Sequence, residues 1–69
     1  MLLDVYLIRG RGEDGHKFQL AMVRNTDGHY YQGEYDPATQ YSTLDELRAT
    51  LSEMVNVPVA ELTLNELNL

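Results

Sequence analysis

The chain of 69 residues contains no cysteine and carries a net charge of −6 at pH 7. This length suits one small domain over residues 1–69, and the lack of cysteine excludes disulfides and thiolate metal sites and favours a reducing compartment. The negative charge disfavours nucleic acid as a partner, because affinity for phosphate comes largely from Lys and Arg. We find no signal peptide and no apolar run of the roughly 18 residues that a membrane helix needs, so we expect a cytoplasmic protein without membrane insertion.

Residues 2–9 form the first predicted strand, because apolar side chains occupy both of its alternating faces. One face holds Leu3, Val5 and Leu7. The other holds Leu2, Tyr6 and Ile8, with Asp4 as its one charged residue. A strand that is apolar on both sides is typical of a central position or of one covered on both faces.

Residues 17–24 form the second predicted strand, and its alternation places Phe18, Leu20 and Met22 on one face and Gln19, Ala21 and Val23 on the other. The tetrapeptide Asn-Thr-Asp-Gly at 25–28 then predicts a tight turn with a positive φ at Gly28. Residues 29–35 read as a third strand. Gly33 in its middle predicts a bulge or a close approach by another element.

Residues 41–55 form the only long segment with a helical period, and its apolar stripe consists of Leu44, Leu47, Leu51, Met54 and Val55. Thr43 followed by Glu46 predicts a capping box, with the Thr43 hydroxyl accepting from the Glu46 N–H and the Glu46 carboxylate returning to the Thr43 N–H. Asn56 is suited to end the helix in the left-handed conformation, and Pro58 prevents its continuation.

The last 13 residues fit either a short strand or a helical turn, and we favour a turn at 58–61 followed by a strand at 62–64 or beyond, beside the first strand. The predicted fold is therefore α+β. It consists of a three- or four-stranded antiparallel sheet, in the order β-β-β-α with the short C-terminal strand as an option, and one amphipathic helix packed on one face.

Two motifs resemble ligand sites and are better explained by turns. The glycines of residues 10–15 match G-x-G-x-x-G, yet a second strand follows them where a dinucleotide site needs a helix. Asp-Gly-His occurs at 14–16 and at 27–29, but the intervening strand separates the two triplets by more than about 20 Å. We predict no cofactor, no metal and no catalytic residue, so the chain is not expected to be an enzyme; a small-ligand site at the glycine loop stays open as a lesser alternative.

Tyrosine is the most usable functional signal, since the chain has five tyrosines, one phenylalanine and no tryptophan. Tyrosine gives a large contact area at low entropic cost in protein interfaces. We therefore predict a small non-catalytic protein-binding module, an adaptor, regulatory or assembly subunit, that acts through an aromatic sheet face or a sheet edge. The candidate partner-binding residues are Tyr6, Tyr30, Tyr31, Arg9 and Arg24.

The alternative prediction is an acidic inhibitor, such as an antitoxin or a phage-type mimic of nucleic acid, acting through Asp45, Glu46 and Glu53. The Asp-Gly turn followed by the Thr-Leu-Asp-Glu-Leu helix makes residues 17–55 resemble the small antitoxin domains of the HicB type, which are three-stranded sheets backed by a helix. We assign no functional residue of this chain from that resemblance. A homodimer is a further hypothesis, because so small a domain has little with which to cover both faces of its first strand.

Overall fold

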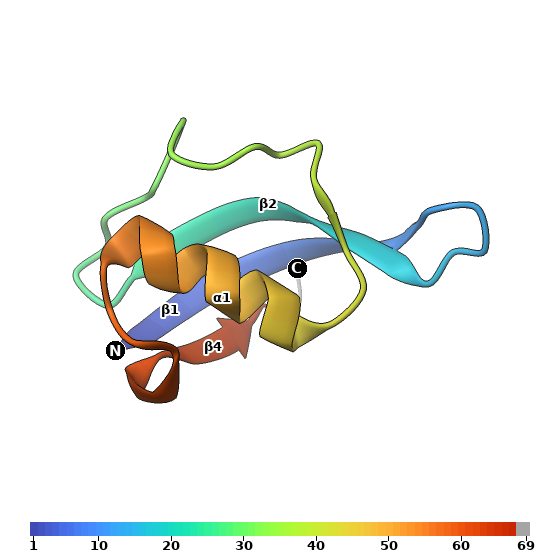
Figure 1. Ribbon diagram of the computed structural model, residues 1–69. Helices are drawn as coiled ribbons and strands as arrows, with labels where there is room; N and C mark the ends of the chain where they lie inside the picture. Colours follow the sequence, from blue (N-terminus) through green and yellow to red (C-terminus); the bar gives the residue numbers. More distant parts are fainter. Residues whose placement is uncertain (68–69) are drawn as a thin grey trace.

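The computed structural model describes residues 1–67, which form a four-stranded sheet with one α-helix on one of its faces (Figure 1). The elements are β1 (Leu2–Arg11), β2 (Lys17–Asn25), β3 (Gln40–Tyr41), α1 (Leu44–Val55), the short 3₁₀ helix η1 (Val59–Glu61) and β4 (Thr63–Glu66). The strand order is β3-β2-β1-β4. The α+β class and the four-stranded option are thus confirmed.

The sheet is antiparallel except at one pair of strands. β1 is antiparallel to β2, and β2 is antiparallel to β3, whereas β4 is parallel to β1. The helix between β3 and β4 acts as the crossover that a parallel neighbour requires, so that β4 starts beside Leu2 and runs with β1. The predicted position of the last strand beside the first is confirmed. The sheet is mostly antiparallel, as predicted, but β4 is parallel to β1, because the α1 crossover returns the chain to the end of the sheet where β1 starts.

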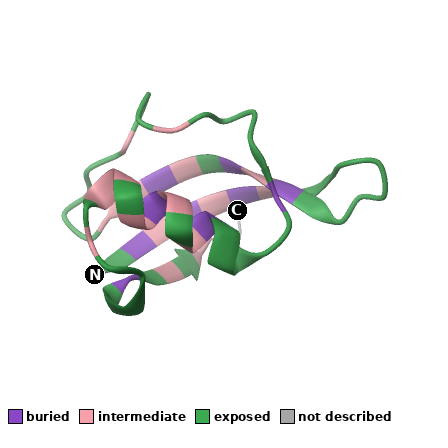
Figure 2. Cartoon of the chain, viewed as in Figure 1, coloured by how far each residue is buried: buried purple, intermediate pink, exposed green. Residues whose placement is uncertain are grey.

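β1 is a central strand, as predicted, and one of its faces forms the middle of the core. Leu3 and Val5 are completely buried and Leu7 is nearly so. Figure 2 shows buried positions alternating with less buried ones along β1 and β2. The helix covers this face alone, because Leu47 and Leu51, the buried residues of α1, belong to the same core cluster as the β1 leucines.

A β-bulge changes the faces of β2. Tyr6 pairs with Met22 and the next residue, Leu7, pairs with Leu20, so Ala21 is an extra residue without a partner in the register. One extra residue reverses the alternation beyond it. The prediction that Met22 shares a face with Phe18 and Leu20 is therefore wrong. Val23 is the buried residue, at 1% exposure, and Met22 lies on the opposite face.

The third strand predicted at residues 29–35 is wrong. After the turn, the chain follows β2 only as far as Tyr31. The Asn25 N–H donates to the His29 carbonyl at 2.9 Å, a single bridge joins Tyr30 and Arg24, and the Tyr31 N–H donates to the Val23 carbonyl at 3.0 Å. Gly33 then takes a φ of +77°, which bends the chain away from the sheet. No atom lies within 4 Å of the place where a Gly33 Cβ would be, so the predicted close approach is absent there. The actual third strand is β3, which pairs with Phe18 and Gln19.

The ends of α1 follow the predicted signals with one change. The Thr43 hydroxyl accepts from the Glu46 N–H at 3.2 Å, but the Glu46 carboxylate accepts from the Ser42 N–H at 3.0 Å and not from that of Thr43. Asn56 ends the helix at φ 56°, ψ 46°. Leu44, predicted on the buried stripe, is 41% exposed because it is the first helical residue.

The chain returns to the sheet through a turn, as predicted, which contains η1 directly after Pro58. Leu62 is buried, and the Thr63 N–H donates to the Met1 carbonyl at 2.8 Å. β4 thus becomes one outer strand of the sheet and β3 the other. Among the described residues, no helix is both long enough and apolar enough to cross a membrane.

Candidate functional site: the open face of the sheet

The face of the sheet that α1 does not cover is the candidate site, and we call it the open face. It is built from the β1 residues that alternate with the buried leucines and from their partners in the register of β2 and β4. Tyr30 joins them through its bridge to Arg24. The open face comprises Leu2, Asp4, Tyr6, Ile8, Gln19, Met22, Arg24, Tyr30, Thr63 and Asn65.

Apolar side chains on this face are left partly accessible to solvent. Tyr6, Ile8 and Met22 are half-buried, since neighbouring strands shield them only from the side. Leu2 and Tyr30 are 41% and 44% exposed, and they are among the most exposed large hydrophobic residues of the described chain. In a small monomeric protein such a collection of apolar side chains is typical of a contact surface.

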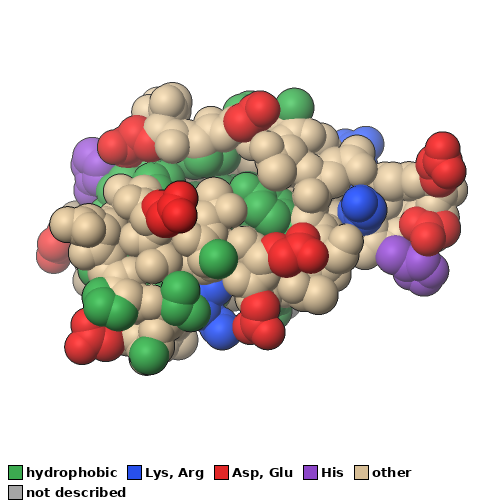
Figure 3. All heavy atoms as spheres, viewed as in Figure 1, with side chains coloured by type: hydrophobic (Ala, Val, Ile, Leu, Met, Phe, Trp, Pro, Cys, Tyr) green, Lys and Arg blue, Asp and Glu red, His purple; other side chains and the backbone are tan. Residues whose placement is uncertain are grey.

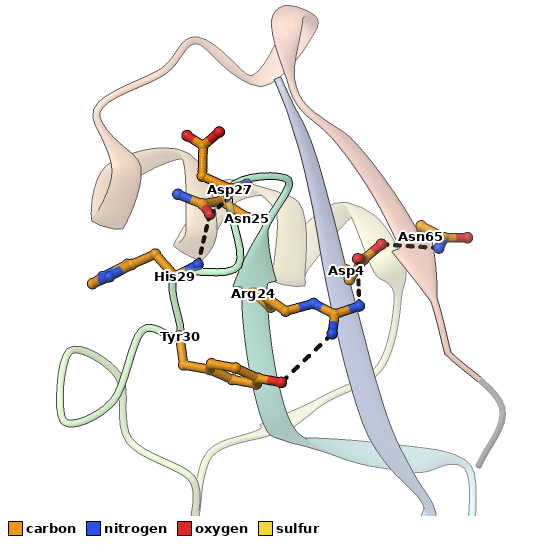
Figure 4. Close-up of polar contacts among 7 residues, drawn as sticks. All are labelled: Asp4, Arg24, Asn25, Asp27, His29, Tyr30 and Asn65. Carbon is orange, nitrogen blue, oxygen red and sulfur yellow. Dashed lines mark hydrogen bonds and ion pairs between the residues drawn. The ribbon is translucent and has the colours of Figure 1, made fainter.

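A chain of polar contacts crosses the open face (Figure 4). Arg24 Nη2 lies 3.0 Å from Asp4 Oδ2, and Asn65 Nδ2 donates to Asp4 Oδ1 at 3.0 Å. Arg24 Nη1 lies 3.5 Å from the Tyr30 hydroxyl, and the guanidinium carbon is 5.8 Å from the centroid of the Tyr30 ring. Three strands and the segment that follows the turn after β2 are therefore joined through two charged side chains. Figure 4 shows these residues on the side of the strands away from α1.

The electrostatics of these contacts favour the ionised pair. The hydrogen bond from Asn65, and after it the bond from Arg24, lowers the pKa of Asp4, against a smaller opposing effect of burial. The bond to Asp4 and the one to Tyr30 raise the pKa of Arg24. The two charges neutralise each other, so the open face has no net charge although the chain carries −6.

Three of the five predicted partner-binding residues, Tyr6, Tyr30 and Arg24, lie together on the open face. Tyr31 does not join them, because it packs against the core while its ring lies edge-on to His29, with 4.8 Å between centroids. Arg9 also lies elsewhere. It pairs with Phe18 of the core face, its guanidinium carbon is 5.3 Å from that ring, and it forms a salt bridge with Glu66.

Sequence reasoning did not identify Asp4 and Asn65 as members of the site. Asp4 had a usable signal, since a lone carboxylate in an apolar strand needs a partner when it is shielded from water. Asn65 had none, because its contact depends on the parallel register that sets it beside Asp4. The site therefore depends on the pairing of strands as much as on tyrosine content.

The alternative acidic surface has fewer uncommitted charges than the sequence indicated. Asp45 pairs with Arg48 at 3.0 Å, one turn along the helix, and the Glu46 carboxylate caps the start of α1. Glu53 is exposed, and we find no partner for it within residues 1–67. The glycine-rich segment is the tip of the β1–β2 hairpin, so it opens no helix. Within residues 1–67, no group of three or more His, Cys, Asp or Glu is placed to hold a metal ion.

Comparison with known proteins adds no assignment. No family model matches the chain, and no curated protein or solved structure matches it significantly. The resemblance to antitoxin domains of the HicB type thus gains no support from these comparisons, and the geometry of the open face is the basis for a functional proposal.

Proposed function

We propose that this chain is a non-catalytic protein-binding module, an adaptor, regulatory or assembly subunit, that contacts another protein through the open face. The observation that carries the proposal is the set of half-exposed apolar side chains around the Asp4–Arg24 ion pair, on a sheet face that no described element covers. Exposed apolar surface with a few oriented polar groups is the usual composition of a protein contact.

The chemistry of the face favours a protein partner over nucleic acid. Tyr6 and Tyr30 offer large rigid side chains with a polar end, which are frequent in energetically important parts of interfaces. The single cation of the face, Arg24, is already engaged by Asp4, so it is poorly placed to neutralise a phosphate backbone. We therefore expect a partner surface that is mainly apolar and carries little net charge.

The face is also a better candidate than either edge of the sheet. Adding a strand to a sheet needs a row of free backbone groups along an outer strand. The outer strands here are β3, with two residues, and β4, with four. Strands this short provide few backbone hydrogen bonds, whereas β1 and β2 are ten and nine residues long and place alternate side chains on the face.

A photo-crosslinking experiment tests the proposal. A photoreactive amino acid replaces Tyr30 on the open face, and in a matched control it replaces Glu53, an exposed residue of α1 on the other side of the sheet. We expect one discrete protein adduct in host cells from position 30 and none from position 53. Introducing Tyr6→Glu into the position-30 variant should abolish the adduct, because it buries a charge in the contact.

The proposal is wrong if position 30 yields no adduct, or if the same adducts form from both positions. An adduct that survives Tyr6→Glu would likewise contradict a contact centred on β1. Circular dichroism of each variant confirms that the fold is retained.

A further inference from the structure

A second feature lies at the base of the β1–β2 hairpin, where two cations have no carboxylate partner within residues 1–67. The chain has five Lys and Arg residues against eleven Asp and Glu residues. Three of the five form salt bridges with a carboxylate of the chain, and they are Arg9, Arg24 and Arg48. Arg11 and Lys17 form none within the described residues, and both are exposed. In so acidic a chain, these two cations are the ones left for a partner.

The two cations lie opposite each other. Arg11 pairs with Lys17 in the register of β1 and β2, with Gly10 as an extra residue before Arg11. Like charges directly opposite each other in antiparallel strands destabilise the pairing. The packing of the hairpin thus gives no reason for this pair, whereas an anion between the two side chains would offset their repulsion.

Both cations are on the side of the hairpin that continues the open face. Lys17 directly precedes the buried Phe18, and side chains alternate along a strand, so Lys17 and its partner Arg11 are turned away from the core face. The next pair on that side, toward the middle of the sheet, is Ile8 with Gln19 of the open face. Arg11 and Lys17 therefore lie just beyond one end of the open face.

Gly12 positions the side chain of Lys17. The alkyl stem of Lys17 lies so close to Gly12 that a Cβ at residue 12 would be 3.2 Å from Lys17 Cγ and 3.3 Å from Lys17 Cδ. A side chain that packs against the backbone has fewer rotamers to lose when its charged group binds a partner. The ammonium group of Lys17 is thus partly organised for a contact in the free chain.

The hairpin projects beyond the end of α1, so the helix does not cover it (Figure 1). Figure 3 shows blue Lys and Arg side chains where the hairpin leaves the body of the molecule and red acidic side chains at its tip. The acidic residues of the hairpin turn are Glu13 and Asp14, and within residues 1–67 neither forms a salt bridge with Arg11 or Lys17. The charge of the hairpin is therefore divided, with its cations nearer to the open face than its acids.

We infer that Arg11 and Lys17 together bind a carboxylate of the protein that covers the open face. The inference rests on the proposed function and specifies the partner: its contact surface is apolar, with an Asp, Glu or C-terminal carboxylate at the end that meets the hairpin. This contact sets the direction of docking, because Arg24, the cation nearer to the other end of the face, is already neutralised by Asp4. A nucleic-acid phosphate is a poorer occupant, since two cations on a chain of net charge −6 attract a polyanion weakly.

Carbodiimide crosslinking tests the contact, because Lys17 is the only lysine of the chain. The reagent activates a carboxylate, and an amine in contact with that carboxylate then forms an amide with it and releases the reagent as a urea. No spacer is added, so only groups that touch are joined. The probe is the protein captured from position 30, purified and mixed with the wild-type chain. We expect an amide between Lys17 Nζ and an Asp, Glu or C-terminal carboxylate of that protein, identified by mass spectrometry of the digested adduct.

Substitutions separate this contact from general attraction between charges. Arg11→Gln combined with Lys17→Gln should raise the Kd for the captured protein about threefold or more at low salt, and less at high salt. Lys17→Arg keeps the charge, so it should preserve the Kd while abolishing the amide. Arg48→Gln removes a cation from α1, on the other side of the sheet, and should leave the Kd unchanged.

The inference is overturned if no amide forms at Lys17, if the double variant binds as tightly as the wild type, or if Arg48→Gln weakens binding as much. It is also overturned if Lys17 couples to a carboxylate of a second copy of this chain. Failure of the proposed function looks different, because position 30 then yields no adduct and both proposals fall. An adduct from position 30 that is equally strong in the double variant leaves the open face as a binding site and refutes the cation pair alone.

Discussion

Asp4 is the residue on which the polar contacts of the open face converge, and its ionisation links the site to stability. Its pKa is lower in the folded chain because Asn65 and Arg24 bond to the charged form. A carboxylate with a lowered folded pKa stabilises the fold at pH values above its unfolded pKa, about 3.9, and this contribution is lost as the pH falls through the folded pKa. We therefore expect Asp4→Asn to destabilise the chain at pH 7 and to have progressively less effect below about pH 4.

Urea unfolding of the wild type and Asp4→Asn at pH 7 and pH 3 measures this difference. Arg9 lowers the pKa of Glu66, so the contribution of Glu66 to the unfolding free energy is also lost at low pH. This loss is the same in both proteins, so the difference between them reports on Asp4. A difference in unfolding free energy that is the same at both pH values would show that Asp4 acts through packing alone.

Leu47 and Leu44 provide a matched pair for the packing of single residues. Both are leucines of α1, but Leu47 is completely buried whereas Leu44 is 41% exposed. Leu47→Ala should cost about 2 to 5 kcal/mol of unfolding free energy, through lost burial and the cavity left behind. Leu44→Ala should cost about 1 kcal/mol or less, because much of that side chain is already in water. Equal losses in urea titrations would contradict the placement of α1 on the sheet.

The start of α1 tests the capping interaction at the scale of an element. The Thr43 hydroxyl satisfies the Glu46 N–H, one of the backbone donors that a helix leaves unpaired. Thr43→Ala should lower the unfolding free energy by about 0.5 to 2 kcal/mol, whereas Thr43→Ser keeps the acceptor and should cost much less. Thermal unfolding with circular dichroism at 222 nm measures both. A serine variant as unstable as the alanine variant would mean that the methyl group of Thr43, and not its oxygen, stabilises the helix.

The elements that sequence reasoning identified are those specified by local signals. α1 has an apolar stripe, a cap and a terminating Asn56, all within neighbouring residues, while β1 alternates between buried and less buried residues from Leu2 to Ile8 and β2 alternates up to its bulge. The third strand was misplaced because the tyrosine-rich pattern after the turn is strand-like, while the conformation of Gly33 directs the chain elsewhere. The bulge at Ala21 and the parallel direction of β4 arise from pairing between strands, which leaves no mark within either strand.

The same distinction applies to the candidate site. Tyr6 and Tyr30 were found because tyrosine itself signals a contact surface, and Arg24 because it lies near them on the second strand. Arg9 and Tyr31 were grouped with them by residue type, although alternation along a strand separates them: Arg9 has the parity of the buried leucines of β1, and Tyr31 is adjacent to Tyr30. Which residues of different strands share a face depends also on the register, and the bulge in β2 makes that register irregular.

At the scale of the whole molecule, charge and apolar surface are segregated. The carboxylates that lie outside ion pairs include Glu53 on the exposed side of α1, whereas the open face is apolar and carries one neutralised pair. Two copies that meet through their open faces would bury apolar surface without opposing charges at the contact. Their total charges of −6 would still repel each other at longer range.

This balance makes the homodimer hypothesis testable through salt. The Debye length falls from about 30 Å at 0.01 M ionic strength to about 8 Å at 0.15 M, so salt weakens the repulsion between copies but leaves apolar contacts intact. We expect the mass from sedimentation equilibrium to rise above the monomer value of 7.9 kDa as salt is added. Tyr6→Glu combined with Tyr30→Glu should keep the chain monomeric at every salt concentration, while Asp45→Asn with Glu53→Gln on the helix side should associate at lower salt than the wild type. A wild-type mass of 7.9 kDa throughout, at micromolar concentration, would exclude self-association and leave the open face to a different protein.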